Sequence, residues 1–131
     1  MPISYQRDDQ RRLINVTVTE PCSVDDISSV IDRQGGEGTW EYALLYDLRA
    51  MTDASTEADL QQLAERVKGA GGERERGPVG IAIRARPALF LLGLMYTKLI
   101  REFATVEVLL SPAQIDAWLV RHAPSGPSRP S

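Results

Sequence analysis

The start of the chain alternates apolar and polar residues in the manner of a β-hairpin. In the stretch 13–18, apolar residues occupy every second position, which is typical of a strand with one buried face. A β-prone stretch at 3–5 precedes it, and a polar turn at 7–11 separates the two. We therefore expect two antiparallel strands that end before Pro21.

Three later segments are expected to be strands: 42–46, closed by Asp47, then 79–83 and 105–110. The first two are continuously apolar. Strands that are buried on both faces have this pattern, and they belong to parallel sheets covered by helices.

Four segments with helical spacing lie between and after these strands. The first has a capping box at Ser23-Val24-Asp25-Asp26 and is expected to stop at Gly35-Gly36. The second begins near 55–56 and ends in 69–72, and the charged stretch 73–77 after it is expected to be a solvated loop. The third helix is expected from Pro87 to about Phe103, and the fourth opens with a cap, a proline and a glutamine at 111–114.

The order of elements is ββαβαβαβα, which predicts an α/β fold. We expect a mostly parallel five-stranded sheet with an antiparallel edge strand and four helices. The chain has 131 residues, enough for one domain, which we place at 1–123. The segment 124–131 is rich in proline and serine and is expected to be a disordered tail.

Composition argues against several classes of function. The net charge of -3 disfavours a nucleic-acid binder, and no apolar run reaches the 18 or so residues of a membrane span. No signal pattern opens the chain, so a cytoplasmic protein is the expectation. A single cysteine, Cys22, is incompatible with an internal disulfide framework.

Residue types that carry catalysis or bind metal are scarce. One histidine, His122, and one cysteine provide neither a zinc site nor a Cys–His nucleophile pair. The glycine-rich stretch 35–38 follows a helix and lacks the spacing of a nucleotide-binding loop. We expect a non-enzymatic protein without cofactor or metal.

The carboxyl ends of the expected parallel strands are a candidate binding edge. Arg49 and Met51 follow one strand there, and Arg84 and Arg86 flank the start of the third helix, whose free amides also favour an anion. Alternatively, Arg84 and Arg86 are solvated or pair with Asp47 or Asp53.

The third helix is unusually apolar. We expect a core stripe along one face and a remaining face that is apolar as well, so the helix is either covered by its neighbour or presents a patch. The expected core stripe consists of Ala88, Leu92, Met95, Leu99 and Phe103, widened by Leu89, Tyr96 and Ile100. The remaining face consists of Phe90, Leu91 and Leu94.

Three segments carry a resemblance to a known family. They are Ala43-Leu44-Leu45-Tyr46-Asp47-Leu48-Arg49, then 79–83 with the apolar helix after it, and 106–111 leading into Ala117-Trp118-Leu119. With the order of elements over roughly 3–121, they make the chain similar to the STAS domain superfamily, in particular its SpoIIAA-like branch of uncharacterised bacterial proteins.

The resemblance implies a bacterial regulatory or protein-binding domain, like the anti-sigma-factor antagonists and the transporter tails of this superfamily. Phosphorylatable antagonists carry a Ser-Gly turn after the third strand, and that turn is missing here. Ser55 and Thr56 are the nearest candidates for phosphorylation, although Ser55 is better explained as a helix cap.

Two functions are compatible with this pattern. The first is binding of a protein partner, or of a second copy as a homodimer, through helix 87–103 and the adjacent loops. The second is a small carrier or sensor that holds an apolar ligand or lipid beneath a mobile helix 87–103. A cavity lined by Phe90, Leu94 and Met95 would favour the carrier, and a flat exposed patch would favour the partner.

Overall fold

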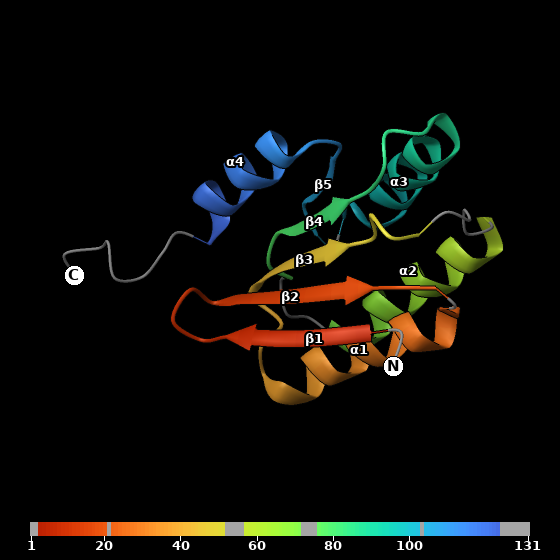
Figure 1. Cartoon of the computed structure of the whole chain (residues 1–131). Coiled ribbons are helices and arrows are strands. Elements are labelled where there is room, and N and C mark those ends of the chain that lie inside the picture. Colours follow the sequence, from red (N-terminus) through yellow and green to blue (C-terminus); the bar gives the residue numbers. More distant parts are fainter. Residues whose placement is uncertain (1–2, 21, 52–56, 72–75, 103, 124–131) are drawn as a thin grey trace.

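The predicted fold is confirmed by a computed structural model, which describes residues 3–20, 22–51, 57–71, 76–102 and 104–123 (Figure 1). The predicted tail at 124–131, Ser55 and Thr56 lie outside these residues. The elements are β1 (Ile3–Asp8), β2 (Leu13–Val18), α1 (Val24–Glu37), β3 (Ala43–Asp47), α2 (Glu57–Gly71), β4 (Val79–Ala82), α3 (Pro87–Ile100), β5 (Val106–Leu109) and α4 (Pro112–His122).

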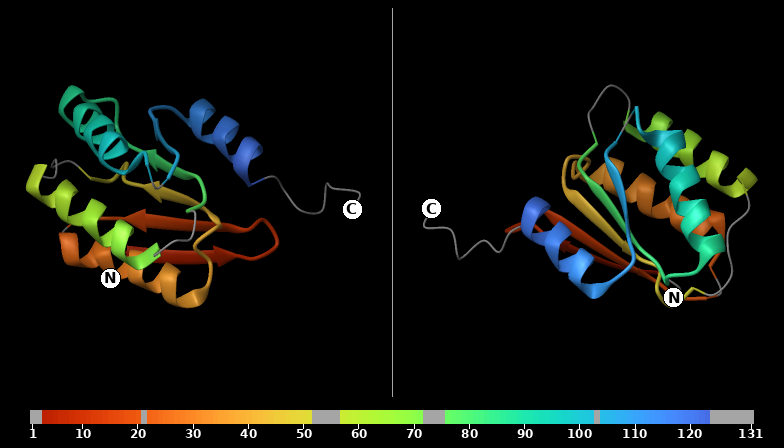
Figure 2. Two further views of the ribbon diagram at one scale, coloured as in Figure 1. Left: turned by 180° about the vertical axis from the view of Figure 1, so that it is seen from behind. Right: turned by 90° about the horizontal axis from the view of Figure 1, so that it is seen from above.

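The strands form one sheet in the order β1-β2-β3-β4-β5. β1 pairs with β2 in antiparallel register, and all other neighbours are parallel. Helices α1, α2 and α3 cover one face of the sheet, whereas α4 lies on the opposite face (Figure 2). The carboxyl ends of β2 to β5 therefore share one edge, as the sequence predicted.

The period-two pattern of the strands divides the core into two layers. Leu44 and Tyr46 of β3 belong to the large core under α1, α2 and α3. Ala43 and Leu45 belong to a smaller core, in which Trp118 of α4 is fully buried. Both faces of β3 are thus covered, which explains its continuously apolar sequence.

Side-chain caps start two of the helices where the sequence predicted them. In α1, the Ser23 Oγ accepts a hydrogen bond from the Asp26 N–H, and the Asp26 carboxylate accepts one from the Ser23 N–H at 2.9 Å. In α4, the Ser111 Oγ accepts from the Gln114 N–H at 3.2 Å. The Gln114 side chain, however, accepts from the Leu110 N–H at 2.6 Å and does not close a capping box on Ser111.

Two predicted helix ends were wrong. Helix α1 continues through Gly35 and Gly36 to Glu37 and ends at Gly38, which adopts a left-handed φ of 75°. Glycine lowers helix propensity by about 1 kcal/mol without breaking a helix, and the left-handed cap is what ends this one. Helix α3 ends at Ile100, earlier than predicted.

No helix in the described part of the chain combines the length and the apolar character that crossing a membrane requires.

Candidate functional site

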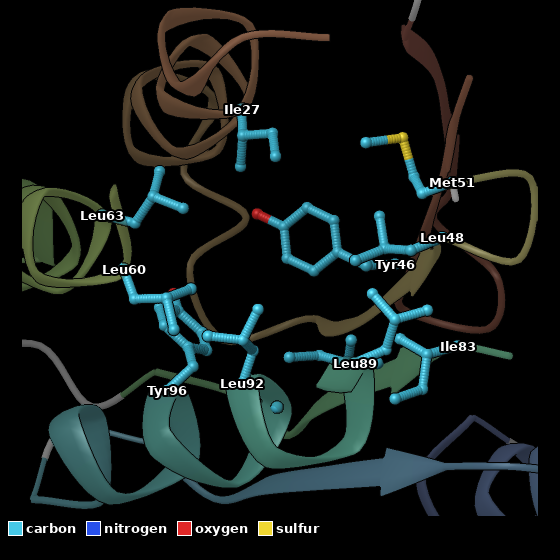
Figure 3. Close-up of a pocket in the computed structure, with 12 residues that line it drawn as sticks. Ile27, Tyr46, Leu48, Met51, Leu60, Leu63, Ile83, Leu89, Leu92 and Tyr96 are labelled. Carbon is cyan, nitrogen blue, oxygen red and sulfur yellow. The ribbon is translucent and has the colours of Figure 1, made fainter. Parts of the chain in front are cut away.

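An apolar pocket lies between the sheet and helices α2 and α3, and we call it the α3 pocket (Figure 3). Its volume is about 100 Å³. Its outer end is made by the half-buried side chains of Leu48, Met51 and Leu89, and its inner end by the buried side chains of Leu60, Leu63 and Tyr96. The remaining lining residues are Ile27, Tyr46, Ile81, Ile83, Leu92 and Gly93.

Local sequence patterns place these side chains around one space. Leu60 and Leu63 are spaced three apart on α2, while Leu92 and Tyr96 are spaced four apart on α3, so each pair lies on one helical face. Tyr46 points from β3 into the centre of the space, with its hydroxyl directed between α1 and α2 (Figure 3). Most of the pocket wall is therefore provided by regular elements, while Leu48, Met51 and Ile83 at its outer end follow strands β3 and β4.

Gly93 allows α3 to lie close to the sheet beside this pocket. A Cβ atom at residue 93 would lie only 2.9 Å from Cγ2 of Val108 on β5, closer than ordinary carbon contacts. A glycine that seems unfavourable for a helix is thus explained by close packing of the helix on the strand.

The pocket is smaller than an engineered apolar cavity that binds benzene, which has about 150 Å³ against about 100 Å³ for the α3 pocket. A ligand of that size would occupy the α3 pocket if the pocket widened or if part of the ligand extended past the outer end.

Two tyrosine hydroxyls are the polar groups of the pocket wall. Burial raises the pKa of Tyr46 and of Tyr96, and the nearby Arg76 cation partly opposes this by lowering both pKa values. Both phenols are therefore protonated at neutral pH and can donate a hydrogen bond.

The burial of Arg76 was not anticipated, because the stretch 73–77, of which 73–75 lie outside the described residues, was expected to be solvated. That expectation is wrong for Arg76, whose side chain is buried with 5% of its surface exposed. Its guanidinium carbon lies 4.2 Å from the centre of the Trp40 ring. Trp40 is distant in sequence, so no local signal distinguishes Arg76 from its charged neighbours.

The outward face of α3 differs from the predicted one. Leu91 and Leu94 are exposed as predicted, at 60% and 44%. Phe90, which was expected on the same face, is partly buried against the core, and Leu99, which was expected in the core, is exposed at 38%. Tyr96 and Ile100, which were expected to widen the core stripe, are buried, and Leu92 and Met95 are partly buried against the core. The lining of the α3 pocket does not include Phe90, Leu94 or Met95, where the carrier hypothesis placed the cavity.

The arginines at the candidate binding edge are partly engaged with groups of this chain. Arg49 forms a bidentate pair with Asp47, at 2.9 Å from Nε to Oδ1 and 2.8 Å from Nη2 to Oδ2. This pair lowers the pKa of Asp47. The Arg84 Nε donates to the Arg49 carbonyl at 2.7 Å, and Arg86 is exposed at the start of α3. Asp47 thus pairs with Arg49, whereas the sequence suggested Arg84 or Arg86 as its partner.

The remaining reactive residue types lie apart from the pocket. Burial raises the pKa of the Cys22 thiol, which disfavours the reactive thiolate. His122 packs on Trp118 with 5.1 Å between ring centres, on the other face of the sheet. The described residues contain no group of three histidine, cysteine or acidic side chains that could hold a metal ion.

Comparisons with known protein families, with curated proteins and with solved structures gave no match. A functional assignment for this chain therefore depends on the geometry of the α3 pocket and of the exposed face of α3.

Proposed function

We propose that this chain is a small non-enzymatic binding domain that holds an apolar molecule in the α3 pocket, as a carrier or a sensor. The observation that supports this proposal most strongly is the pocket itself, which is preformed, apolar and about 100 Å³ in volume. Concave apolar sites with a few polar groups are the usual form of small-molecule sites. In open parallel sheets such sites lie toward the carboxyl ends of the strands, as the outer end of this pocket does.

Helix α3 is suited to admit such a ligand. Its first turn has no side-chain cap, because Arg86 at the N-cap position makes no capping hydrogen bond. Gly93 in its middle lowers its helix propensity by about 1 kcal/mol relative to alanine. Outward movement of this helix would open the pocket, and an apolar ligand would compensate for the packing that the movement loses.

A tryptophan that fills the pocket provides the test. Leu92→Trp places the larger side chain in the pocket wall, and Leu91→Trp places the same side chain on the exposed face of the same helix. Binding of a small fluorescent apolar probe should be lost in Leu92→Trp and unchanged in Leu91→Trp. Thermal unfolding of both variants controls for misfolding.

Native mass spectrometry of the purified chain gives an independent readout. A co-purifying small molecule in the wild-type chain that is absent in Leu92→Trp supports the proposal. Equal probe binding by the wild type and both variants would contradict it, because the probe would then be bound elsewhere.

A second candidate function is supported by the exposed leucines of α3. Leu91 and Leu94 lie on the outward face, and such residues are preferred contacts of a protein partner. In this alternative the chain is a STAS-like regulatory domain, and we commit to a second copy of the chain as the partner. Leu91→Glu should then convert a dimer into a monomer in native mass spectrometry, whereas a wild-type chain that is monomeric at all concentrations would contradict it.

A further inference from the structure

A line of exposed side chains runs along the outer face of α3. Its members are spaced four, three, four and three residues apart, so they lie above one another on one side of the helix. They are Pro87, Leu91, Leu94, Lys98 and Arg101, all exposed, and we call them the α3 outer stripe. Over these residues the stripe is about 21 Å long.

The position of α3 makes this stripe accessible to a large surface. Helix α2 lies between α1 and α3, so α3 is the last helix in the row that covers this face of the sheet (Figure 2). The residues 84–86 that lead into the helix are exposed as well. The accessible face therefore includes both the stripe and the connection before it.

Positive charge lies at both ends of the stripe. Arg84 and Arg86 precede its first residue, while Lys98 and Arg101 form its end. No acidic residue occurs in 84–101, although the net charge of the chain is -3. Within the segments that the structure describes, none of these four cations forms an ion pair. The face thus combines exposed leucines with uncompensated positive charge.

The neighbouring surface has a different character. Glu102 follows the stripe and lines a groove between α2 and α3 together with Leu99, Glu65 and Lys68. Charges of both signs lie around this groove. We therefore leave Leu99 out of the stripe, although it is exposed.

We propose that the α3 outer stripe docks on an anionic lipid surface, with Leu91 and Leu94 inserted among the headgroups and the four cations beside the negative lipid groups. Helices with apolar and basic side chains on their exposed face lie in the plane of such an interface. Each lysine or arginine close to the surface adds to the attraction. The inference goes beyond the proposed function, because it does not require a ligand in the α3 pocket.

A second copy of the chain matches this stripe less well. A two-fold axis brings the same patch of both copies together. With Leu91 and Leu94 at the centre, the cations at each end would lie opposite cations of the other copy, whether the two helices run parallel or antiparallel. Like charges facing each other disfavour such a complex, whereas negative headgroups compensate all four cations.

The first test is flotation of the chain with lipid vesicles. Vesicles of phosphatidylcholine with about 30% phosphatidylserine should bind the wild-type chain at least about tenfold more strongly than phosphatidylcholine alone. About 1 M salt should remove this preference, because the Debye length is then only about 3 Å.

Two variants divide the contribution of the stripe into charge and apolar contact. Lys98→Gln/Arg101→Gln should weaken binding to the anionic vesicles by about ten- to thirtyfold. Leu91→Asn/Leu94→Asn should weaken it by at least about tenfold, because the inserted apolar area is lost. Thermal unfolding shows whether each variant folds, and the charge variant with the salt titration carries the test should the leucine variant not fold.

A matched control has the same net charge as the first variant. Arg33→Gln/Arg66→Gln removes two exposed cations that pair with Glu37 and Asp32 on α1. Its binding to anionic vesicles should stay within about twofold of the wild type. An equal loss in this control would show that net charge, and not the stripe, determines binding, and would overturn the inference.

Tryptophan fluorescence reports on the stripe directly. Trp40 and Trp118 are buried, so their emission should not change when vesicles are added. In Leu91→Trp the new side chain should shift its emission to shorter wavelength with anionic vesicles. Val120→Trp, at an exposed position of α4 on the opposite face of the sheet, should show no shift.

The remaining outcomes would each contradict the proposal. Equal binding to both kinds of vesicle would show that the cations do not take part. A wild-type chain that forms a dimer and binds no vesicle would assign the stripe to a second copy. A shift in Val120→Trp without one in Leu91→Trp would place the lipid contact on the other face of the sheet.

Discussion

The close packing of α3 on β5 leads to a prediction about Gly93. Alanine at this position gains about 1 kcal/mol of helix propensity. Its Cβ, however, would lie 2.9 Å from Val108 Cγ2 and 3.4 Å from Val108 Cγ1. Valine is branched at Cβ and stiff at χ1, so it cannot move the contacting methyl aside by a small rotation.

The magnitude follows from these opposing effects. Inserting a methyl group into a well-packed site costs about 1–3 kcal/mol, so Gly93→Ala should destabilise the wild-type chain by about 1 kcal/mol after the propensity gain. In a Val108→Ala background the contacting methyl groups are absent. There Gly93→Ala should stabilise the chain by about 1 kcal/mol, which gives a coupling of about 2 kcal/mol between the two positions.

Urea denaturation of the four proteins in this double-mutant cycle provides the measurement, with the midpoint and slope fitted separately. Gly69→Ala on α2 is the matched control, because a Cβ there meets nothing within 4 Å. This control should show the propensity gain alone. The reasoning is refuted if Gly93→Ala stabilises the wild-type chain as much as Gly69→Ala does, or if its effect is the same with Val108 and with alanine.

Three further predictions follow from the same structure. Leu91→Glu should change the free energy of unfolding by no more than about 0.5 kcal/mol, since Leu91 is 60% exposed; a loss of about 3 kcal/mol in thermal unfolding would instead mark it as core. Stability should fall as the pH rises from 10 to 12, because the pKa of Tyr5 is raised from 10.0 to about 12 in the folded state and the unfolded chain therefore loses that proton first. The free energy of unfolding is measured over this range together with the tyrosinate absorbance. A free energy of unfolding that does not change with pH would contradict the prediction. In hydrogen exchange, the amides of 88–100 in α3 should exchange faster than those of 57–68 in α2, and equal protection would argue against α3 as a mobile cover of the pocket.

Local signals in the sequence were sufficient for most of the fold. The Ser23 capping box and the alternation in 13–18 depend on neighbours within a few residues, and the structure contains both as predicted. The stop at Gly35-Gly36 was wrong, because glycine only weakens a helix and the left-handed residue that ends it, Gly38, comes later.

The orientation of α3 was harder to predict because the helix is apolar on nearly every face. The expected core stripe included Leu99, which is exposed. Tyr96 and Ile100, which were expected to widen that stripe, are buried, and Gly93 brings that side of the helix close to β5.

The polar groups of the site depend on contacts that are distant in sequence. Tyr46 was expected in a buried strand, but its position opposite Tyr96 requires the packing of α3 across β3 and β4. Arg76 stands in a run of charged residues and is buried because it stacks on Trp40. Contacts of this kind leave no local signal in the sequence. A pocket beneath α3 could therefore be proposed from the sequence, but the residues that line it could not be predicted.

Methyl-detected NMR of the chain with labelled leucine, isoleucine and valine would test the central claim most directly. In a titration with a small apolar probe, the methyl signals of Leu60, Leu63 and Leu92 should shift in a saturable manner, because these side chains line the α3 pocket. Those of Leu91 and Leu94, on the exposed face of the same helix, should stay in place. Shifts confined to Leu91 and Leu94, or shifts that never saturate, would contradict a ligand inside the pocket.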